Sequence, residues 1–239
     1  MPSTAVLAHG AGSRPAVARD LLAPACLGTA AVDSVDARDG VERVADRIHE
    51  ACVSAARAGR PVSLVGGISL GAHAAARWAL EQQSLEQVGP VPALLLVMPA
   101  WAGEPGPVAA MTAATADEIE REGSAAVLDR LRRDPALAGD WVLRELERSW
   151  ADGDDAGLVR ALRLAASSPA PSLDELARVK ADVVAVVALA DDPLHPEDVA
   201  RQWADAIPGA LLATVPRHAP AAEPGVLGRV GRELLTGSR

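Results

Sequence analysis

"VGGISLGAHAAARWAL", residues 65–80, contains a Gly-x-Ser-x-Gly pentapeptide centred on Ser69. The apolar segment PVSLVGGI (61–68) before the serine predicts a buried strand, and the Ala-rich segment after it favours a helix. A serine at such a strand-to-helix turn is typical of an exposed nucleophile, with glycines where side chains would collide. The following helix would direct free N–H groups at the site. The alternative is a glycine-rich turn with a helix-capping serine.

Apolar segments elsewhere predict a repeated alternation of strands with helices. We expect helices near 14–22, 41–58, 69–83 and 196–206, and a last one through Leu234. Continuously apolar strands of this kind are typical of a parallel sheet that helices cover on both faces. The sequence therefore predicts an α/β fold with a mostly parallel sheet of about six strands, at 4–9, 29–36, 61–68, 91–101, 181–190 and 210–216.

The block between Trp101 and Lys180 interrupts this alternation. Its apolar residues recur with helical spacing, and Pro or Gly residues divide it into segments. We therefore expect an α/β core formed by 1–100 and 179–239, and an all-helical insertion at 101–178 that lies over one end of the sheet.

Composition restricts the class of protein. The chain has 239 residues, of which 49% are hydrophobic, which suffices for one ordinary core. A net charge of −9 argues against nucleic acid as a partner. The chain has no apolar run of membrane-spanning length and no basic leader segment, so we expect a cytoplasmic protein without a membrane partner. With two cysteines we expect no disulfide framework. A homodimer is compatible with the sequence.

A serine nucleophile needs a base, and the base needs an orienting carboxylate. Functional groups in parallel sheets gather at the carboxyl ends of strands, where Asp191, Asp192 and His218 are expected. The chain order Ser69, Asp192, His218 is the order of nucleophile, acid and base that is typical when the serine lies at such a strand-to-helix turn. Taken singly, Asp192 could be a turn residue before a proline and His218 an exposed loop residue.

Four other histidines are weaker candidates for the base. His49 lies within a predicted helix and is expected at the surface. His73 follows the serine too closely to reach back to it. His9 is expected to shape the loop HGAG (9–12), and His195 lies in the segment DDPLHP (191–196).

An acyl-transfer site also needs donors for the oxyanion. We expect the N–H of Leu70, directly after the serine, and the N–H of Ala11 to supply them. Glycines at 10 and 12 would let this backbone approach the substrate. No Cys/His spacing suggests zinc, and the chemistry needs neither a metal nor an organic cofactor.

These motifs together resemble the α/β-hydrolase superfamily. The matching segments are HGAG (9–12), GISLG (67–71), ALADDPLHP (188–196) and Arg217-His218, and they span nearly the whole chain in order. The resemblance implies a Ser69–His218–Asp192 triad, Asp192 rather than Asp191 as the acid, and a helical cap inserted after the strand that ends near Met98.

The chain departs from the superfamily's pattern in two places. The usual N-terminal hairpin is missing before the first strand, so six parallel strands are expected. The family often has Gly before its histidine, whereas here Pro216-Arg217 precedes His218 and makes that loop less free.

The resemblance implies that substrate choice lies in the cap. We expect Gly10, Trp101 and Met111 to contact the substrate, and Trp141 and Trp150 to pack the cap on the core. A mostly apolar pocket favours a neutral, hydrophobic ester, thioester or lactone, cleaved through an acyl-enzyme.

Two other functions compete with hydrolysis. A nucleotide-binding loop at HGAGSRP (9–15), with Asp33 or Asp36 further on, loosely resembles a dinucleotide fingerprint, but Pro15 stands where its third glycine belongs. The same fold could also serve lyase, isomerase or cyclase chemistry, or binding alone, because fold does not determine function.

Overall fold

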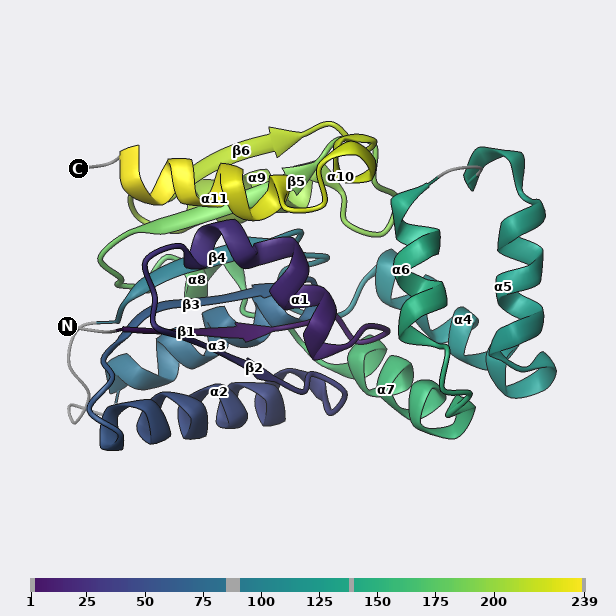
Figure 1. Ribbon diagram of the computed structural model, residues 1–239, viewed down its shortest axis with the longest axis horizontal. Helices are drawn as coiled ribbons and strands as arrows, with labels where there is room; N and C mark the ends of the chain where they lie inside the picture. The colour runs from purple at the N-terminus through teal and green to yellow at the C-terminus, as the bar shows by residue number, and fades with distance from the viewer. Residues whose placement is uncertain (1–2, 85–90, 138–139, 238–239) are drawn as a thin grey trace.

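The computed structural model describes residues 3–84, 91–137 and 140–237. The strands are β1 (Thr4–Ala8), β2 (Ala31–Val35), β3 (Val62–Ile68), β4 (Ala93–Val97), β5 (Val184–Leu189) and β6 (Leu211–Val215). They form one six-stranded sheet in the order β2-β1-β3-β4-β5-β6, and every neighbouring pair is parallel. This arrangement confirms the predicted parallel sheet (Figure 1).

Both faces of the sheet are buried, which explains why its strands are apolar throughout. Successive side chains of a strand point to opposite faces, so Leu94 and Leu96 of β4 join one apolar cluster and Leu95 and Val97 join the other. The alternation recurs along β1 and β5. The hydrophobic effect therefore favours helices on both sides of the sheet.

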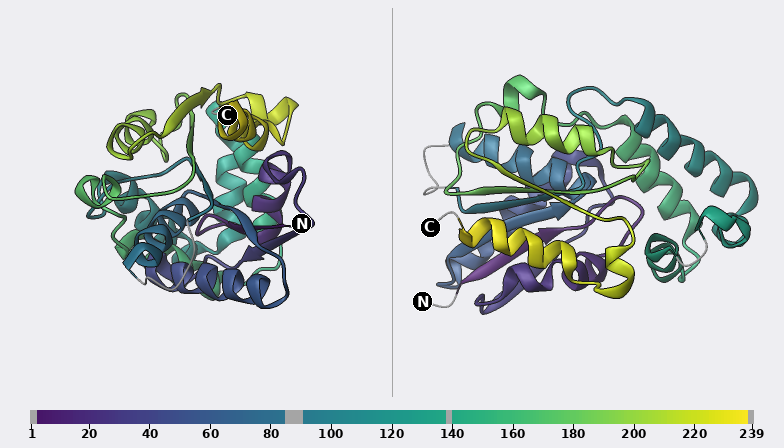
Figure 2. Two further views of the ribbon diagram at one scale, coloured as in Figure 1. Left: turned by 90° about the vertical axis from the view of Figure 1, so that its left-hand side faces the viewer. Right: turned by 90° about the horizontal axis from the view of Figure 1, so that it is seen from above.

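Helices cover the two faces as separate layers (Figure 2). One layer consists of α1 (Pro15–Leu22) and α11 (Val226–Gly237), with the short elements η1 (Ala23–Cys26) and α10 (Ala219–Ala222) nearby. The other layer consists of α2 (Gly40–Arg57), α3 (Leu70–Ser84) and α9 (Glu197–Ala206). In α2 the buried positions include Val41, Val44 and Ile48, which helical spacing places on one face.

The block between β4 and β5 is helical, and no strand occurs among its described residues. It contains α4 (Pro107–Glu122), α5 (Ser124–Arg133), η2 (Pro135–Leu137), α6 (Trp141–Ser149), α7 (Asp155–Ser167) and α8 (Leu173–Leu176). Figure 1 shows α4 to α7 gathered beyond one end of the sheet, whereas α8 packs back against α3 and α9. We call residues 101–178 the helical insert.

The helical insert has an apolar cluster of its own. Ile119, Val127 and Leu162 are buried in it, together with Ala11 and Leu70 from the rest of the chain. Because Ala11 and Leu70 flank the predicted site, the insert packs directly on the serine turn and on the loop after β1. None of the described helices is both long and apolar enough to cross a membrane.

Candidate active site

Ser69 occupies a strained turn between β3 and α3. Its φ of 56° lies in the left-handed region, where a residue with a side chain is uncommon. A Cβ at Gly67 would overlap the backbone of Gly71, and a Cβ at Gly71 would overlap the carbonyl group of Ala8. The two glycines therefore permit the turn, and Ser69 is held half-buried at its apex.

The close approach at Gly71 makes a stability prediction. Gly71→Ala is expected to lower the free energy of unfolding by about 1–3 kcal/mol, because the added methyl group must displace backbone atoms of β1. Urea unfolding followed by Trp fluorescence measures this change. Gly106→Ala is the matched control, since its Cβ would meet no atom within 4 Å. Equal unfolding midpoints for the two variants would contradict the close packing of the turn.

The loop after β1 lies against the serine. A Cβ built at Gly10 would lie 3.4 Å from Ser69 Cβ and 3.9 Å from Ser69 Oγ, so this loop passes beside the serine side chain. The N–H of Ser13 donates to the Gly10 carbonyl oxygen at 3.0 Å and closes the turn. Ala11 and Leu70, the residues expected to donate to an oxyanion, both line the cavity that contains Ser69.

His9 is fully buried beneath this loop. Its Nε2 accepts the N–H of Ala37 at 3.0 Å, and its Nδ1 lies 2.7 Å from the Gly10 carbonyl oxygen. Burial lowers the pKa of His9, although the Gly10 hydrogen bond and nearby Asp36 act in the opposite direction. A neutral imidazole bonded to backbone on both sides shapes the loop and is not available as a base.

Left-handed backbone recurs at the neighbouring strand ends. Among the described residues, Ser69, Met98 and Asp191 are the ones other than glycine with positive φ, at 56°, 52° and 56°. They follow the carboxyl ends of β3, β4 and β5, which are adjacent in the sheet. Strained backbone often clusters at functional sites, so this edge is where chemistry is expected.

Asp192 contacts His195, which lies three residues further along the same turn. Its Oδ2 is 2.9 Å from His195 Nδ1, and its Oδ1 accepts the N–H of Leu194 at 3.0 Å. Burial on its own would raise the pKa of Asp192. The hydrogen bond and charge of His195, the Leu194 N–H and the charge of Arg217 outweigh burial and lower that pKa. The side chain is therefore an ionised, oriented carboxylate.

The predicted partnership of Asp192 with His218 differs from the arrangement observed. His218 precedes α10 with an exposed side chain, and it is not among the residues that line the cavity. After the turn that begins at Pro216, Arg217 lines the cavity and His218 does not. Within the described residues, no hydrogen bond joins Ser69 Oγ to an imidazole. The sequence did contain a sign of the Asp192–His195 contact. His195 follows Asp192 by three residues, and aspartate side chains often bond to groups in the turn that they begin.

His73 is buried on the helix that follows Ser69. Its Nε2 accepts the N–H of Ala100, and its ring packs against Trp101 and Trp203. Burial, together with the nearby charge of His195, lowers the pKa of His73 to about 3. His73 therefore stays neutral, and its ring supports Trp101 and Trp203.

One cavity of about 440 Å³ joins the motifs. Trp101, expected at the root of the insert, is 92% buried in its wall, and Met111 contributes a more exposed side chain from α4. The lining is predominantly apolar. Residues from the loops after β1, β3, β5 and β6 line it together: Gly10, Ala11, Ser69, Leu70, Asp192, His195 and Arg217.

Helix α6 crosses from one side of this site to the other and is fastened at both ends. The indole N–H of Trp141 donates to the Arg217 carbonyl oxygen at 3.0 Å, and that of Trp150 donates to the Gly12 carbonyl oxygen at 2.9 Å. These bonds, with burial of both rings, pack the insert on the core.

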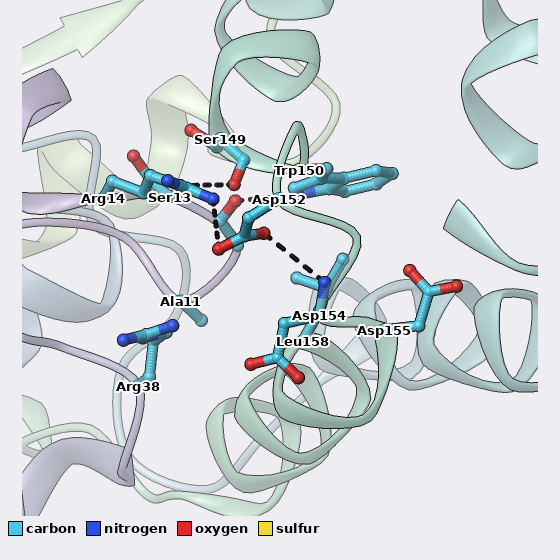
Figure 3. Close-up of a pocket in the computed structure, with 11 residues that line it drawn as sticks. Ala11, Ser13, Arg14, Arg38, Ser149, Trp150, Asp152, Asp154, Asp155 and Leu158 are labelled. Carbon is cyan, nitrogen blue, oxygen red and sulfur yellow. Dashed lines mark hydrogen bonds and ion pairs between the residues drawn. The ribbon is translucent and has the colours of Figure 1, made fainter. Parts of the chain in front are cut away.

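Arg14 reinforces the second attachment (Figure 3). Its Nε donates to the Ser149 carbonyl oxygen at 2.6 Å, and its Nη2 lies 2.5 Å from Asp152 Oδ2. The loop that carries Ala11 is therefore tied to the insert by an ion pair as well as by the Trp150 indole.

Comparisons with known proteins identify the fold. No protein-family model matches the sequence, and no curated protein matches it. Solved structures do match over nearly the whole chain. An esterase from Thermogutta terrifontis is 17% identical, with 99% of this chain and 90% of that chain covered and a TM-score of 0.71. An enol-lactonase from Burkholderia xenovorans is 15% identical, with 99% and 92% covered and a TM-score of 0.72. A hydrolase from Pseudomonas aeruginosa is 19% identical, with 98% and 90% covered and a TM-score of 0.70.

The chain therefore has the fold of the α/β-hydrolase superfamily, as the motifs implied. Its six-stranded parallel sheet carries the turn of Ser69 after β3 and the turn of Asp191 and Asp192 after β5.

Proposed function

We propose that this chain is a serine hydrolase that cleaves an ester, thioester or lactone bond of a small apolar substrate. The observation that carries the proposal is the convergence on one cavity of a serine with left-handed backbone, a glycine-rich loop beside its hydroxyl, and a carboxylate–imidazole pair. Likeness in fold to an esterase and an enol-lactonase supports the same class of reaction.

In this mechanism the Asp192–His195 pair activates Ser69. The Asp192 carboxylate accepts a hydrogen bond from the Nδ1–H of His195, which leaves Nε2 free to take the Ser69 hydroxyl proton. Ser69 Oγ then bonds to the substrate carbonyl carbon, and the carbonyl oxygen becomes an oxyanion. The imidazolium returns its proton to the leaving group as the acyl-enzyme forms. Water, activated by the same imidazole, releases the acid and restores Ser69.

The backbone N–H groups of Ala11 and Leu70 bind the oxyanion in this proposal. Leu70 begins α3, so its N–H lies in the first turn of the helix, where intrahelical acceptors are lacking. Ala11 lies in the turn whose first residue, Gly10, approaches Ser69. A single donor of this kind contributes about 3 kcal/mol to lowering the barrier.

His218 is the alternative base. It follows β6, the strand next to the one that carries Asp192, and it completes the chain order typical of this fold. His195 is preferred because it already contacts the carboxylate and lines the cavity, whereas the side chain of His218 is exposed.

The helical insert acts as a cap in this proposal, on a core of residues 1–100 and 179–239. It supplies much of the apolar lining, and Trp101, Met111 and Gly10 contact the substrate. Neutral hydrophobic acyl groups suit such a wall, because burying a charged group there would be costly.

A fluorophosphonate probe tests the nucleophile directly. We expect mass spectrometry of the labelled protein to find the phosphonyl group on Ser69, and Ser69→Ala to remain unlabelled under the same conditions. Ser13→Ala removes the buried hydroxyl of another residue that lines the cavity and should be labelled like the parent chain. Labelling at another residue, or undiminished labelling of Ser69→Ala, would refute the assignment.

A further inference from the structure

Arg217 connects the helical insert to the turn of Asp191 and Asp192 that follows β5. Its Nε and Nη2 both donate to Asp140 Oδ2, at 3.0 Å and 2.9 Å. Its Nη1 donates to the Asp191 carbonyl oxygen at 3.2 Å and lies 3.5 Å from Asp192 Oδ1. One guanidinium therefore faces two carboxylates that belong to segments far apart in the chain.

Both carboxylates are almost removed from solvent. The side chain of Asp140 is 9% exposed and that of Asp192 is 5% exposed. Buried carboxylates carry a large desolvation cost unless they are paired, and two of them near each other also repel. Arg217 is the cation that they share, and its charge acts with the contacts from His195 and Leu194 to keep Asp192 ionised.

The arginine is itself held in place from the insert. Asp140 Oδ1 accepts the N–H of Val142 at the start of α6, which leaves Oδ2 for Arg217. The backbone of Arg217 is held as well, because its carbonyl oxygen accepts the Trp141 indole N–H. The position of α6 thus determines where the guanidinium lies.

The two oxygens of Asp192 have different partners. Oδ1 faces Arg217 and the Leu194 N–H, whereas Oδ2 faces His195. An arginine on Oδ1 leaves Oδ2 available to the imidazole. We propose that Arg217, aimed by Asp140 of the helical insert, is a positioning residue that holds Asp192 with Oδ2 toward His195. This role rests on the proposed function of the Asp192–His195 pair.

The charged and titratable groups around Asp192 come from three segments. His195 lies on its own turn, Arg217 on the loop after β6, and Asp140 at the start of α6 behind the arginine. His73, near His195, is neutral because burial lowers its pKa to about 3. Removing Arg217 therefore leaves His195 as the one neighbouring group of this set that can carry positive charge.

The decisive experiment titrates Asp192 by carboxyl carbon-13 NMR and assigns its signal by the loss in Asp192→Asn. Arg217→Gln is expected to raise the pKa of Asp192, since an opposite charge at this range favours the ionised carboxyl group. Arg217→Lys keeps the charge and should leave the pKa low. Arg201→Gln is the control, because Arg201 pairs with Glu197 on α9 and does not line the cavity.

Kinetics of the intact protein on a short p-nitrophenyl ester give the second readout. Arg217→Gln should lower kcat about 10- to 100-fold with KM little changed, because orientation of the base is lost. Arg217→Lys should recover part of kcat. Asp140→Asn tests the aiming step, and a smaller loss of kcat is expected from it.

These measurements separate the two proposals. An Asp192 titration unchanged in Arg217→Gln, or a kinetic effect on KM alone, overturns the role of Arg217. The NMR titration needs no turnover, so it still decides that role if the parent chain shows no Ser69-dependent activity, a result that would overturn the proposed function instead. If Arg217→Gln does not fold, Asp140→Asn decides the aiming role, and kcat equal to that of the parent chain overturns it.

Discussion

Replacement of Ser69 by alanine is expected to lower kcat/KM for an active ester by about 10⁴-fold or more, as loss of a triad serine does in other hydrolases. The variant lacks an oxygen nucleophile, so an acyl-enzyme cannot form. Any remaining rate would come from water attacking a substrate still held by the cavity and the Ala11 and Leu70 N–H groups. Initial rates on p-nitrophenyl acetate and butyrate measure the loss.

Ser63→Ala is the matched control for that experiment. Ser63 lies on β3, the strand that leads to Ser69, but it is exposed. Its hydroxyl bonds to Ser3 Oγ, and it does not line the cavity. Its kcat/KM should stay within about threefold of the parent value, as is usual for surface substitutions. Thermal unfolding of both variants separates loss of chemistry from loss of fold. Residual activity of Ser69→Ala comparable to that of Ser63→Ala would contradict a serine mechanism.

The second large effect concerns the base. His195→Ala is expected to lower kcat by about 10²- to 10⁴-fold, the range that a positioned general base contributes. His218→Ala should remain within about threefold of the parent chain, because its side chain is exposed and outside the cavity lining. Steady-state kinetics on the same ester compare the two variants directly.

His49→Ala controls for general effects of removing an imidazole. His49 lies on α2 and contacts Gln82, away from the site. A large loss in His218→Ala with little change in His195→Ala would assign the base to the loop after β6 and reject the pairing proposed for His195. Losses of equal size in all three variants would indicate damage to the fold.

The superfamily fold was predictable because its causes are local or periodic. Val65 to Ile68 form a strand because they are apolar and lie on a sheet buried on both faces. Gly67 and Gly71 predict the sharp turn, because a side chain at either position would collide with the backbone. The helical insert was predictable from spacing, since apolar residues recur at helical intervals within its segments, as Val127 and Leu131 do in α5, and pack in one cluster.

The partners of side chains were not predictable in the same way. Asp192 was expected to face His218, but its carboxylate faces His195 and Arg217. Arg217 was noted only as a departure from glycine, and its bond to Asp140 spans 77 residues of sequence. Trp141 and Trp150 were expected to pack the insert on the core, and they do so through burial and through indole hydrogen bonds to backbone oxygens.

The sequence by itself therefore determined the sheet, the serine turn and the loops that meet at its carboxyl edge. Hydrophobic periodicity and glycine placement act over a few residues, so they can be read along the chain. Only the tertiary structure decided which imidazole contacts Asp192 and which cation balances it. Those choices depend on the path of the loop through Pro216 and on where α6 lies, and both follow from packing between segments far apart in the chain.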